Sequence, residues 1–291
     1  MDNIHLAKLT TTAKEYLDKP LDERIKKCKE QIWIPYPQAL NILDELEELF
    51  EHPKKDRMPN LLIVGSTNNG KTTIINQFMS KHPMYLDVYT TIPVIKISAP
   101  ISPSHTALYE KILDEILVPY GTKESASRKE YQVKNVLADL KTRMIVIDEF
   151  QDIFHGKVHF QREFLTAVKQ LGNDLKIPIV AAGVWEVQSV VSTDPQIANR
   201  FETIKIENWK ANEDFARLVM SFESTLPLKE ASNLHTKKLF SKLYDMSEGM
   251  IGELARILEK ASIYALKHNQ EKITIDTLNS INYIKPSERR T

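Results

Sequence analysis

The sequence predicts an α/β fold in which a parallel sheet with helices on both faces is followed by a small all-helical domain. Strand-like apolar runs alternate with helical segments up to about residue 210, and only helical periodicity continues after that point. The first apolar run also leads into a loop of the kind that holds phosphate groups. We therefore expect an N-terminal helical extension over residues 1–30, a nucleotide-binding α/β domain over 31–210 and a helical lid domain over 211–291.

The expected elements alternate regularly along the α/β domain. Strands are expected at 61–64, 93–98, 144–148, 178–182 and 204–206, and helices at 107–117, 129–140, 159–171 and 185–191, with a further helix opening at Thr73. In the last eighty or so residues, helical periodicity with polar starts marks ANEDFARLVMSFESTL, LHTKKLFSKLYDMS, GMIGELARILEKASIYALKH and TIDTLNSINYI. No internal repeat is visible.

A loop near the start of the α/β domain fits the pattern G-x-x-x-x-G-K-[ST]. It reads GSTNNGKT, from Gly65 to Thr72, and lies between the apolar run LLIV and the helical segment TIINQF. A phosphate loop requires this order of strand, loop and helix. The whole chain has only 8 glycines, so two at this spacing favour a functional loop. A glycine-containing surface turn before an unrelated helix is the alternative.

Each residue type in this loop has a chemical reason. Glycines let the main chain turn back so that successive N–H groups point at phosphate oxygens, with the positive end of the helix dipole behind them. Lys71 is expected to reach the β- and γ-phosphates of ATP, and the Thr72 hydroxyl to bind Mg²⁺. The residues expected to hold the nucleotide are Gly65, Ser66, Asn68, Asn69, Gly70, Lys71, Thr72 and Thr73.

A second motif, RMIVIDEFQDIF, ends a buried strand with two carboxylates. Asp148 and Glu149 would lie at the C-terminal edge of the sheet, where open α/β sheets bind their ligands. Asp148 is expected to hold Mg²⁺ through water, and Glu149 to polarise the attacking water as the general base. Alone, the pattern is often just the end of a strand, but its place after a phosphate loop favours the catalytic interpretation.

Composition excludes several classes of protein. Lysine plus arginine equals aspartate plus glutamate, at 39 each, so any binding to nucleic acid must use a local basic patch. The single cysteine, Cys28, cannot form an internal disulfide. No apolar run approaches the roughly 18 residues that span a bilayer, and the N-terminus lacks the apolar core of a signal peptide. We expect a soluble cytoplasmic protein with no membrane partner, and no metal other than Mg²⁺.

Five stretches taken together resemble a known family. They read RMPNLLIVGSTNNGKTTIINQF, MIVIDEFQDIFHG, QREFLTAVKQLGNDLKIPIVAAGV, STDPQIANRFETIKIENW and EGMIGELARIL, within roughly residues 32–258. The chain is similar to the AAA+ ATPases and, within them, to the TniB/TnsC-like transposition regulators, relatives of the Mu transposon's B protein. The resemblance implies a P-loop NTPase three-layer sandwich, with five parallel strands in the order fifth, first, fourth, third, second, followed by a helical lid.

The resemblance also implies roles for two arginines. Arg200, in IANRFE, matches the position from which AAA+ proteins supply an arginine finger to a neighbour's nucleotide, and a surface salt bridge at a helix end is the alternative. The preceding TDPQIAN predicts a short capped helix. Arg256, in GMIGELAR, matches the sensor-2 arginine facing the γ-phosphate, and a pairing with Glu253 or Glu259 is the alternative. The chain departs from the family just after the fourth strand, where many relatives place a polar sensor-1 residue and AAGVWE offers Val184 and Trp185.

Double-stranded DNA is the partner that the resemblance implies, held inside a ring or helical filament of identical subunits. Two stretches would face such a pore, SAPISPSHTALYEK and PYGTKESASRKEYQVK. From them we expect Ser104, Thr122, Lys123 and Lys129 to contact phosphates without reading bases. As a bare charge pattern, the second stretch favours a solvated helix face, and only the family resemblance favours DNA contact.

The sequence thus predicts an ATPase that binds DNA without sequence preference and regulates transposition. It would assemble on target DNA and recruit or activate a transposase together with a target-selection protein. A helicase-loading or replication-initiation ATPase of the same fold is one alternative, and an appended winged-helix domain would favour it. A second alternative is a signalling switch NTPase that binds a protein rather than DNA. A DNA-stimulated ATPase assay separates this switch from the DNA-binding ATPases.

Overall fold

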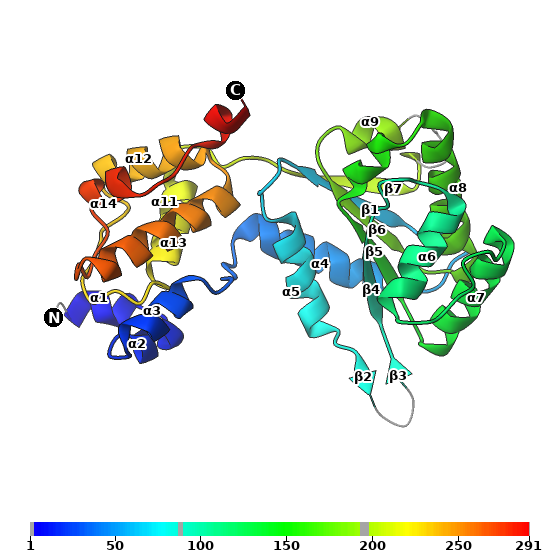
Figure 1. The fold of residues 1–291 in the computed structure, drawn as a ribbon, viewed down its shortest axis with the longest axis horizontal. Coiled ribbons are helices and arrows are strands. Elements are labelled where there is room, and N and C mark those ends of the chain that lie inside the picture. The colour runs from blue at the N-terminus through cyan, green and yellow to red at the C-terminus, as the bar shows by residue number, and fades with distance from the viewer. Residues whose placement is uncertain (1–2, 87–89, 193–197, 291) are drawn as a thin grey trace. The chain divides into compact units, whose positions relative to one another are not determined.

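The computed structural model describes residues 3–86, 90–192 and 198–290, which form two compact units. The sheet unit consists of Pro37–Thr67 and Lys71–Ile206, and the helical unit of Met1–Tyr36, Asn68–Gly70 and Glu207–Thr291. Figure 1 labels the elements of both units. Each unit is described by itself below.

The sheet unit is built on five parallel strands in the order β4-β5-β6-β1-β7. In chain order this is second, third, fourth, first, fifth, so the strand order expected from the family resemblance is confirmed. The strands are β1 (Asn60–Gly65), β4 (Val94–Ser98), β5 (Met144–Asp148), β6 (Ile179–Gly183) and β7 (Phe201–Ile206). The structure adds a two-stranded antiparallel hairpin of β2 (Tyr85–Leu86) and β3 (Thr90–Thr91), which no pattern in the sequence predicted.

Helices cover both faces of the sheet, which explains the unbroken apolar runs of its central strands. Every residue of β1, β5 and β6 is buried, as expected for parallel strands with both faces covered. In Figure 1, α5 with α4 beside it lies on one face of the sheet, and α6, α7 and α8 lie on the other. The helices of this unit are α4 (Pro37–Glu51), α5 (Lys71–Lys81), α6 (His105–Glu115), α7 (Ala126–Asp139), η1 (Phe150–His155), α8 (Val158–Leu175) and α9 (Val187–Val191).

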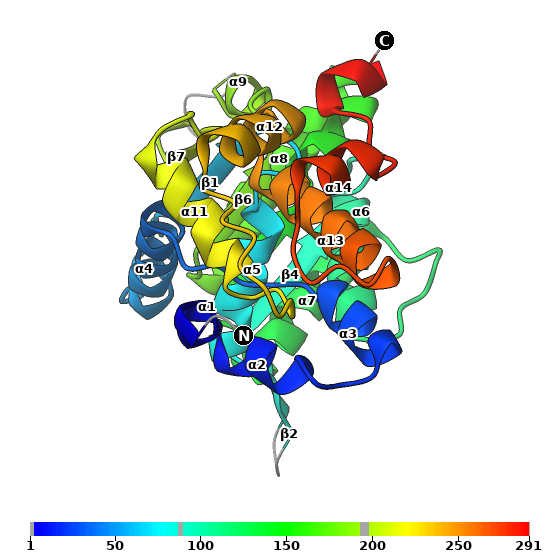
Figure 2. The ribbon, with the colours of Figure 1, turned by 90° about the vertical axis from the view of Figure 1, so that its left-hand side faces the viewer.

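The helical unit combines the two ends of the chain. Its helices are α1 (Asn3–Lys8), α2 (Thr11–Tyr16), α3 (Leu21–Cys28), α11 (Glu213–Glu223), α12 (Lys237–Ser247), α13 (Ile251–Lys267), α14 (Ile275–Ser280) and η2 (Pro286–Arg290). The α3 helix packs against α13, as Figure 2 shows. The buried Arg24 of α3 donates to the Pro227 carbonyl and to the Glu271 carboxylate.

The unit boundaries differ from the segments expected from the sequence. Residues 1–36 share a unit with 207–291, whereas a separate extension over 1–30 and a lid beginning at 211 were expected. The physical reason is a set of contacts between distant residues, such as Arg24 with Glu271, which no local pattern in the sequence can reveal. In the parts of the chain that the structure describes, no helix is both long and apolar enough to cross a bilayer.

The junction between α12 and α13 generates a first prediction. Gly249 has φ +71°, and a Cβ there would lie 2.3 Å from the Trp209 carbonyl oxygen. The Trp209 backbone is held at this place by the hydrogen bond from its N–H to the Gly249 carbonyl. We expect Gly249→Ala to destabilise the helical unit by roughly 1–3 kcal/mol, because the left-handed backbone is strained and the backbone contact cannot move aside. Urea unfolding of both proteins measures the change.

Gly121→Ala is the matched control, because a Cβ at Gly121 would meet only the flexible Glu124 side chain. We expect this surface substitution to change stability by less than about 0.5 kcal/mol. Equal unfolding midpoints for the two variants would contradict the assignment of a required glycine at 249.

Candidate nucleotide-binding site

The loop between β1 and α5 has the backbone that a phosphate site requires. Gly65 ends β1 where a Cβ would lie 2.7 Å from the Ile206 carbonyl oxygen of the neighbouring strand β7, so only glycine fits. Gly70 has φ +86° and Asn68 has φ +58°, so the main chain passes twice through the left-handed region. The loop is followed directly by α5, whose first residue is Lys71. The loop therefore ends at a helix N-terminus, which favours anions.

The ammonium group of Lys71 lies over the loop. Its Nζ donates to the Gly65 carbonyl at 2.9 Å and to the Ser66 carbonyl at 2.8 Å. Burial lowers the pKa of Lys71, and the nearby carboxylates of Glu149 and Asp148 oppose this shift. The two carbonyls hold a desolvated cation at the place where a phosphate chain would bring negative charge.

Thr72 and Asp148 meet at the C-terminal edge of the sheet. The Thr72 hydroxyl donates to Asp148 Oδ2 at 2.9 Å, and the Glu149 N–H donates to Asp148 Oδ1 at 2.9 Å. Asp148 is 5% exposed at the end of β5. A hydroxyl and a buried carboxylate in contact are the oxygen ligands that Mg²⁺ takes in phosphate sites, so the pair fits the predicted metal position. The three described ranges contain no cluster of three or more His, Cys, Asp or Glu that could hold another metal ion.

Glu149 is oriented by Gln151, a residue of the second motif to which the sequence analysis gave no role. It is exposed, with φ +50°, and its Oε2 accepts a hydrogen bond from the Gln151 side-chain amide. The Gln151 Oε1 in turn accepts from the Val184 N–H at 3.3 Å, at the end of β6. Gln151 therefore links the predicted general base to the strand end where the family places sensor 1. The one signal in the sequence was a polar residue two positions after Glu149.

Trp185 occupies the sensor-1 region and contacts the loop. Its indole Nε1 donates to the Ser66 hydroxyl at 3.2 Å. A tryptophan N–H is only a donor, so it can fix the orientation of the Ser66 side chain. The segment AAGVWE therefore contacts the phosphate loop directly, through the Trp185 indole.

The middle of the loop, Asn68–Gly70, is itself part of the helical unit. Asn69 is buried, and its side-chain amide donates to the Glu207 carbonyl. Tyr36 is 6% exposed, packs edge-on against Trp209, and its hydroxyl lies 3.6 Å from where a Cβ on Gly70 would stand. Within the described residues this hydroxyl has no hydrogen-bond partner. Burial of a donor without a partner is costly, so a hydroxyl left unpaired beside the loop fits a site that receives a polar ligand.

Arg256 has no described hydrogen bond to Asn68–Gly70, the loop residues that belong to the same unit. It lies outside the buried stripe of α13 and has no hydrogen-bond or ion-pair partner among the residues that the structure describes. Glu253, one turn earlier, is the α13 side chain that contacts the loop, through the Asn68 amide at 2.9 Å. Neither alternative pairing of Arg256, with Glu253 or with Glu259, is present among the described side chains, and its role as sensor 2 stays a prediction.

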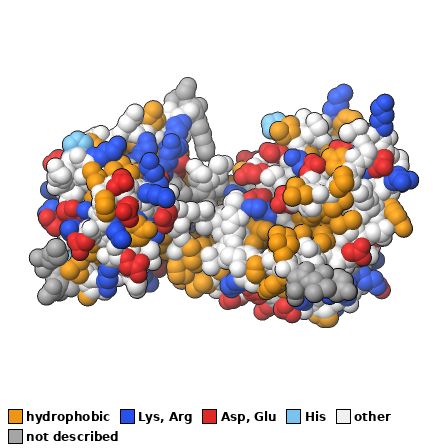
Figure 3. All heavy atoms as spheres, turned by 60° about the horizontal axis from the view of Figure 1, so that its bottom comes forward, with side chains coloured by type: hydrophobic (Ala, Val, Ile, Leu, Met, Phe, Trp, Pro, Cys, Tyr) orange, Lys and Arg blue, Asp and Glu red, His pale blue; other side chains and the backbone are white. Residues whose placement is uncertain are grey.

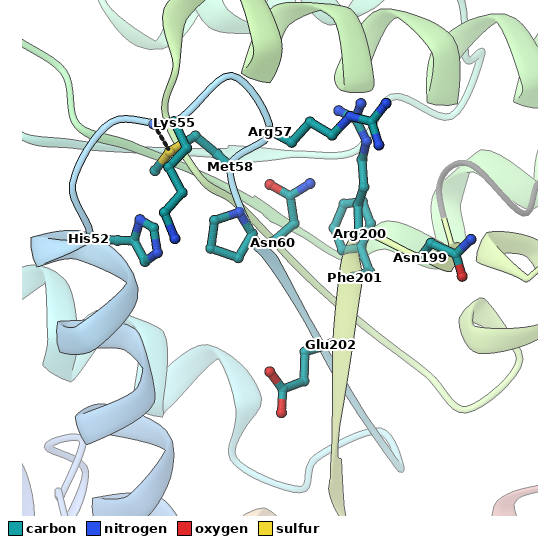
Figure 4. Close-up of a pocket in the computed structure, with 10 residues that line it drawn as sticks. His52, Lys55, Arg57, Met58, Asn60, Asn199, Arg200, Phe201 and Glu202 are labelled. Carbon is teal, nitrogen blue, oxygen red and sulfur yellow. Dashed lines mark hydrogen bonds between the residues drawn. The ribbon is translucent and has the colours of Figure 1, made fainter.

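Arg200 lies at the opposite end of β1 from the loop. The Asn60 N–H, at the start of β1, donates to the Arg200 carbonyl at 2.9 Å, and the Arg200 guanidinium donates to the Asn173 side-chain oxygen. Arg200 and Arg57 line a hollow of about 770 Å³, in which Figure 4 shows the Arg57 side chain running toward Arg200. Among the described residues neither arginine forms an ion pair, so the alternative of a surface salt bridge is not observed. The predicted capped helix falls largely on residues 193–197, outside the described residues.

The structure contradicts one predicted DNA contact. The Lys129 side chain is fully buried, its Nζ pairs with Glu110 Oε1 at 2.5 Å, and it lies over the Tyr120 ring. It occupies the buried stripe of α7 with Val133 and Leu137. A buried and paired ammonium cannot contact a DNA phosphate, so the prediction for Lys129 is wrong.

The other predicted DNA contacts lie at or near the surface. Thr122 and Lys123 are exposed in the turn before α7, and Ser104 caps α6 by accepting a hydrogen bond from the Ala107 N–H. On the face drawn in Figure 3, basic and acidic side chains are interspersed over each unit. On this face, a phosphate-binding surface would therefore be a small local patch.

A family model described as TniB, bacterial TniB protein, matches residues 24–211, which is more than half of the chain. This segment contains the loop, Asp148, Glu149 and Arg200. No curated protein matches the chain in sequence.

Solved structures show a common fold at low sequence identity. The ORC2 protein of Aeropyrum pernix (ADPNP-ADP complexes) is similar with a TM-score of 0.63 at 13% identity, covering 91% of this chain and 74% of that chain. Cdc6p from Pyrobaculum aerophilum has a TM-score of 0.60 at 16% identity, covering 94% and 68%. The Aeropyrum pernix ORC1 protein in complex with DNA has a TM-score of 0.58 at 13% identity, covering 88% and 68%. The chain thus has the P-loop fold of the AAA+ ATPases.

The site generates a prediction with two variants. Lys71→Ala should weaken ATP binding by at least about a hundredfold, because the ammonium group over the loop is removed. Glu149→Gln should bind ATP normally and lose hydrolysis by about a hundredfold to ten-thousandfold, because an amide cannot accept the proton of the attacking water. Equilibrium binding of a fluorescent ATP analogue and phosphate release measure the two effects.

Lys81→Ala is the control for Lys71→Ala, because Lys81 ends the same helix and pairs with Glu47 far from the loop. It should bind and hydrolyse ATP like the parent protein. Near-parental hydrolysis by Glu149→Gln would show that Glu149 is not the general base.

Proposed function

Because the chain belongs to the TniB family, we propose that it is an ATP-dependent regulator of DNA transposition that binds DNA without sequence preference. The observation that carries the proposal is the loop Gly65–Thr72, with Lys71 over it and Thr72 on Asp148, within the segment that matches the family. The protein assembles as a homo-oligomer on target DNA and presents it to a transposase, and a target-selection protein chooses the site. Membership of this family favours a role in transposition over the replication-initiation and signalling alternatives.

Different residues of the site have different roles in ATP hydrolysis. The loop N–H groups and Lys71 bind the phosphate chain, and Thr72 with Asp148 holds Mg²⁺, which neutralises charge on the phosphates. Glu149 accepts a proton from the attacking water, and its bond from Gln151 fixes the direction of its carboxylate. Trp185 keeps the Ser66 end of the loop in place.

Arg200 completes the site of a neighbouring subunit. Because β1 rises about 3.3 Å per residue, Asn60 and Gly65 lie roughly 17 Å apart, and Arg200 is bound to the Asn60 end. An arginine side chain cannot cover that distance to its own loop. The hollow it lines with Arg57 holds two guanidinium groups without a paired carboxylate among the described residues, which suits a phosphate supplied by another copy of the chain.

DNA binding rests on a few phosphate contacts per subunit. Thr122 and Lys123 provide a hydroxyl and an ammonium in an exposed turn, and Ser104 lies at the start of α6. Since the chain has a net charge of zero, no long-range field adds to these contacts. Affinity therefore depends on ATP-driven assembly, which repeats the contacts along the DNA.

The exposed turn with Thr122 and Lys123 can be tested by substitution. Replacing Thr122 and Lys123 together by alanine should weaken ATP-dependent binding equally for unrelated DNA sequences. The slope of log affinity against log salt should become shallower by about one for each lysine that no longer neutralises a phosphate. Lys237→Ala, which removes an exposed charge on α12, is the control and should leave both quantities unchanged. Fluorescence anisotropy over a salt series measures them. Unchanged binding by the double variant would show that the DNA surface lies elsewhere, and residues 102–105 would be the next candidates.

The role of Arg200 in a neighbouring subunit can be tested by mixing two inactive variants. Arg200→Ala should bind ATP almost normally but hydrolyse it about a thousandfold more slowly, the usual contribution of an arginine supplied between subunits. Mixing Arg200→Ala with Lys71→Ala should restore ATPase activity, because the intact arginine of one variant serves the intact loop of the other. No recovery in mixtures that co-assemble by light scattering would rule out the trans role.

A further inference from the structure

A buried carboxylate of the helical unit contacts the phosphate loop and has no part in the chemistry described above. Glu253, in the first turn of α13, is 2% exposed. Its Oε1 accepts a hydrogen bond from the Asn68 side-chain amide at 2.9 Å. A charged group buried this deeply is costly unless its oxygens are paired, so its partners show what it is for.

The first turn of α13 also contacts the main chain of Asn68. The Gly252 N–H donates to the Asn68 carbonyl at 2.9 Å, and a Cβ on Gly252 would lie 2.7 Å from that oxygen. Asn68 has φ +58°, a conformation that few residues other than glycine and asparagine adopt readily. Two adjacent residues of α13, Gly252 and Glu253, therefore hold both the backbone and the side chain of one loop residue.

The cation that pairs with Glu253 comes from the C-terminal turn η2. Arg289 donates from Nη1 to Oε1 and from Nη2 to Oε2, both at 2.8 Å, which is bidentate geometry. The Tyr283 hydroxyl donates to Oε2 at 2.6 Å, and the Arg289 guanidinium lies 5.1 Å from the Tyr283 ring centre. Arg289 is the only cation paired with Glu253 among the residues that the structure describes.

We infer that Arg289 is a positioning residue for nucleotide binding: it holds the Glu253 carboxylate against Asn68, so the shape of the phosphate loop depends on the C-terminal turn Pro286–Arg290. This inference rests on the proposed function, since it assumes that the loop binds ATP. Arg289 acts only through Glu253 and Asn68, because its described contacts are with Glu253, Tyr283 and the Ile284 carbonyl rather than with the loop. The C-terminal turn then becomes a point at which nucleotide affinity can be changed.

The charge balance supports this chain of contacts. The hydrogen bonds from Arg289 are the largest cause that holds the pKa of Glu253 at about 2, against the effect of burial. Without Arg289, the carboxylate keeps two neutral donors, Tyr283 and Asn68, but no opposite charge. It must then draw in water or protonate, and either change alters the oxygen that Asn68 contacts.

The coupling also works in the reverse direction. If docking of the C-terminal turn strengthens nucleotide binding, nucleotide binding must strengthen docking of the turn by the same factor. A ligand or partner that displaces Arg289 would therefore promote nucleotide release. The expected coupling, at about fivefold to a hundredfold, is within the usual range for linked sites.

The test uses the protein of residues 1–291 and compares Arg289→Gln with Lys285→Gln. Lys285 lies in the same C-terminal segment, but its ion pairs are with Asp245 and Glu288. Arg289→Gln should raise the Kd for ADP and the KM for ATP by about tenfold, with kcat changed much less. Arg289→Lys, which keeps the charge but loses the bidentate geometry, should recover part of the affinity. Lys285→Gln should bind like the parent protein.

Two readouts separate positioning from a loss of general stability. In an Asn68→Gly background, which tolerates positive φ but lacks the amide, Arg289→Gln should cost little further affinity. ADP should also slow amide exchange of residues 283–289 in the parent protein but not in Lys71→Ala. If Arg289 served only general stability, Arg289→Gln would lose ADP affinity equally in both backgrounds, and ADP would not change amide exchange.

The outcomes distinguish the two proposals. Parental ADP affinity for Arg289→Gln, with binding abolished by Lys71→Ala, would overturn the inference and leave the proposed function intact. Equal losses for Arg289→Gln with and without the Asn68 amide would overturn it too. Absence of ATP or ADP binding by the parent protein would overturn both.

Discussion

A phosphate loop must hold its shape without using the N–H groups that face its ligand, and this constraint organises the site. Side chains around the loop supply the missing support. Lys71 donates to the carbonyls of Gly65 and Ser66, and Trp185 donates to the Ser66 hydroxyl. Asp148 accepts from Thr72 at the other end of the loop, and Glu253 accepts from Asn68 in the middle. Each of these contacts fixes a part of the loop without using one of its backbone N–H groups.

Some of the supporting groups come from elements that also carry the chemistry, which links loop shape to function. The strand β5 brings Asp148 and Glu149, and Gln151 ties Glu149 to Val184 at the end of β6. A shift of either strand end would therefore change both the metal position and the direction of the base. Because Lys71 is partly desolvated between two carbonyls, a phosphate chain that takes over these contacts adds a charge partner to a partly buried cation.

Much of the sheet unit could be predicted from the sequence because its signals are local. The run MIVID is both a continuous apolar segment and a strand end with carboxylates, and the structure places β5 at Met144–Asp148 as expected. The Lys129 error was avoidable, since Lys129, Val133 and Leu137 recur at helical spacing on one buried stripe. A lysine at such a position is expected to lie in the core with a charge partner rather than at a DNA surface.

Other features could not be predicted because they depend on contacts across the chain. Glu253 and Arg289 are 36 residues apart, and neither pattern around them indicates a pair. Tyr36 and Gly70 are brought together only by the fold of the helical unit. The hairpin of β2 and β3 has strands of two residues, which are too short for periodicity to show.

In the proposed function, nucleotide binding at this loop drives assembly of identical subunits on DNA. Sedimentation velocity of the parent protein with a DNA duplex of arbitrary sequence, in the presence of ATP, ADP or no nucleotide, tests it most directly. We expect a large protein–DNA assembly in the presence of ATP but not of ADP or without nucleotide, for any duplex sequence, and no assembly of Lys71→Ala. The same sedimentation profile in all three nucleotide conditions would contradict it.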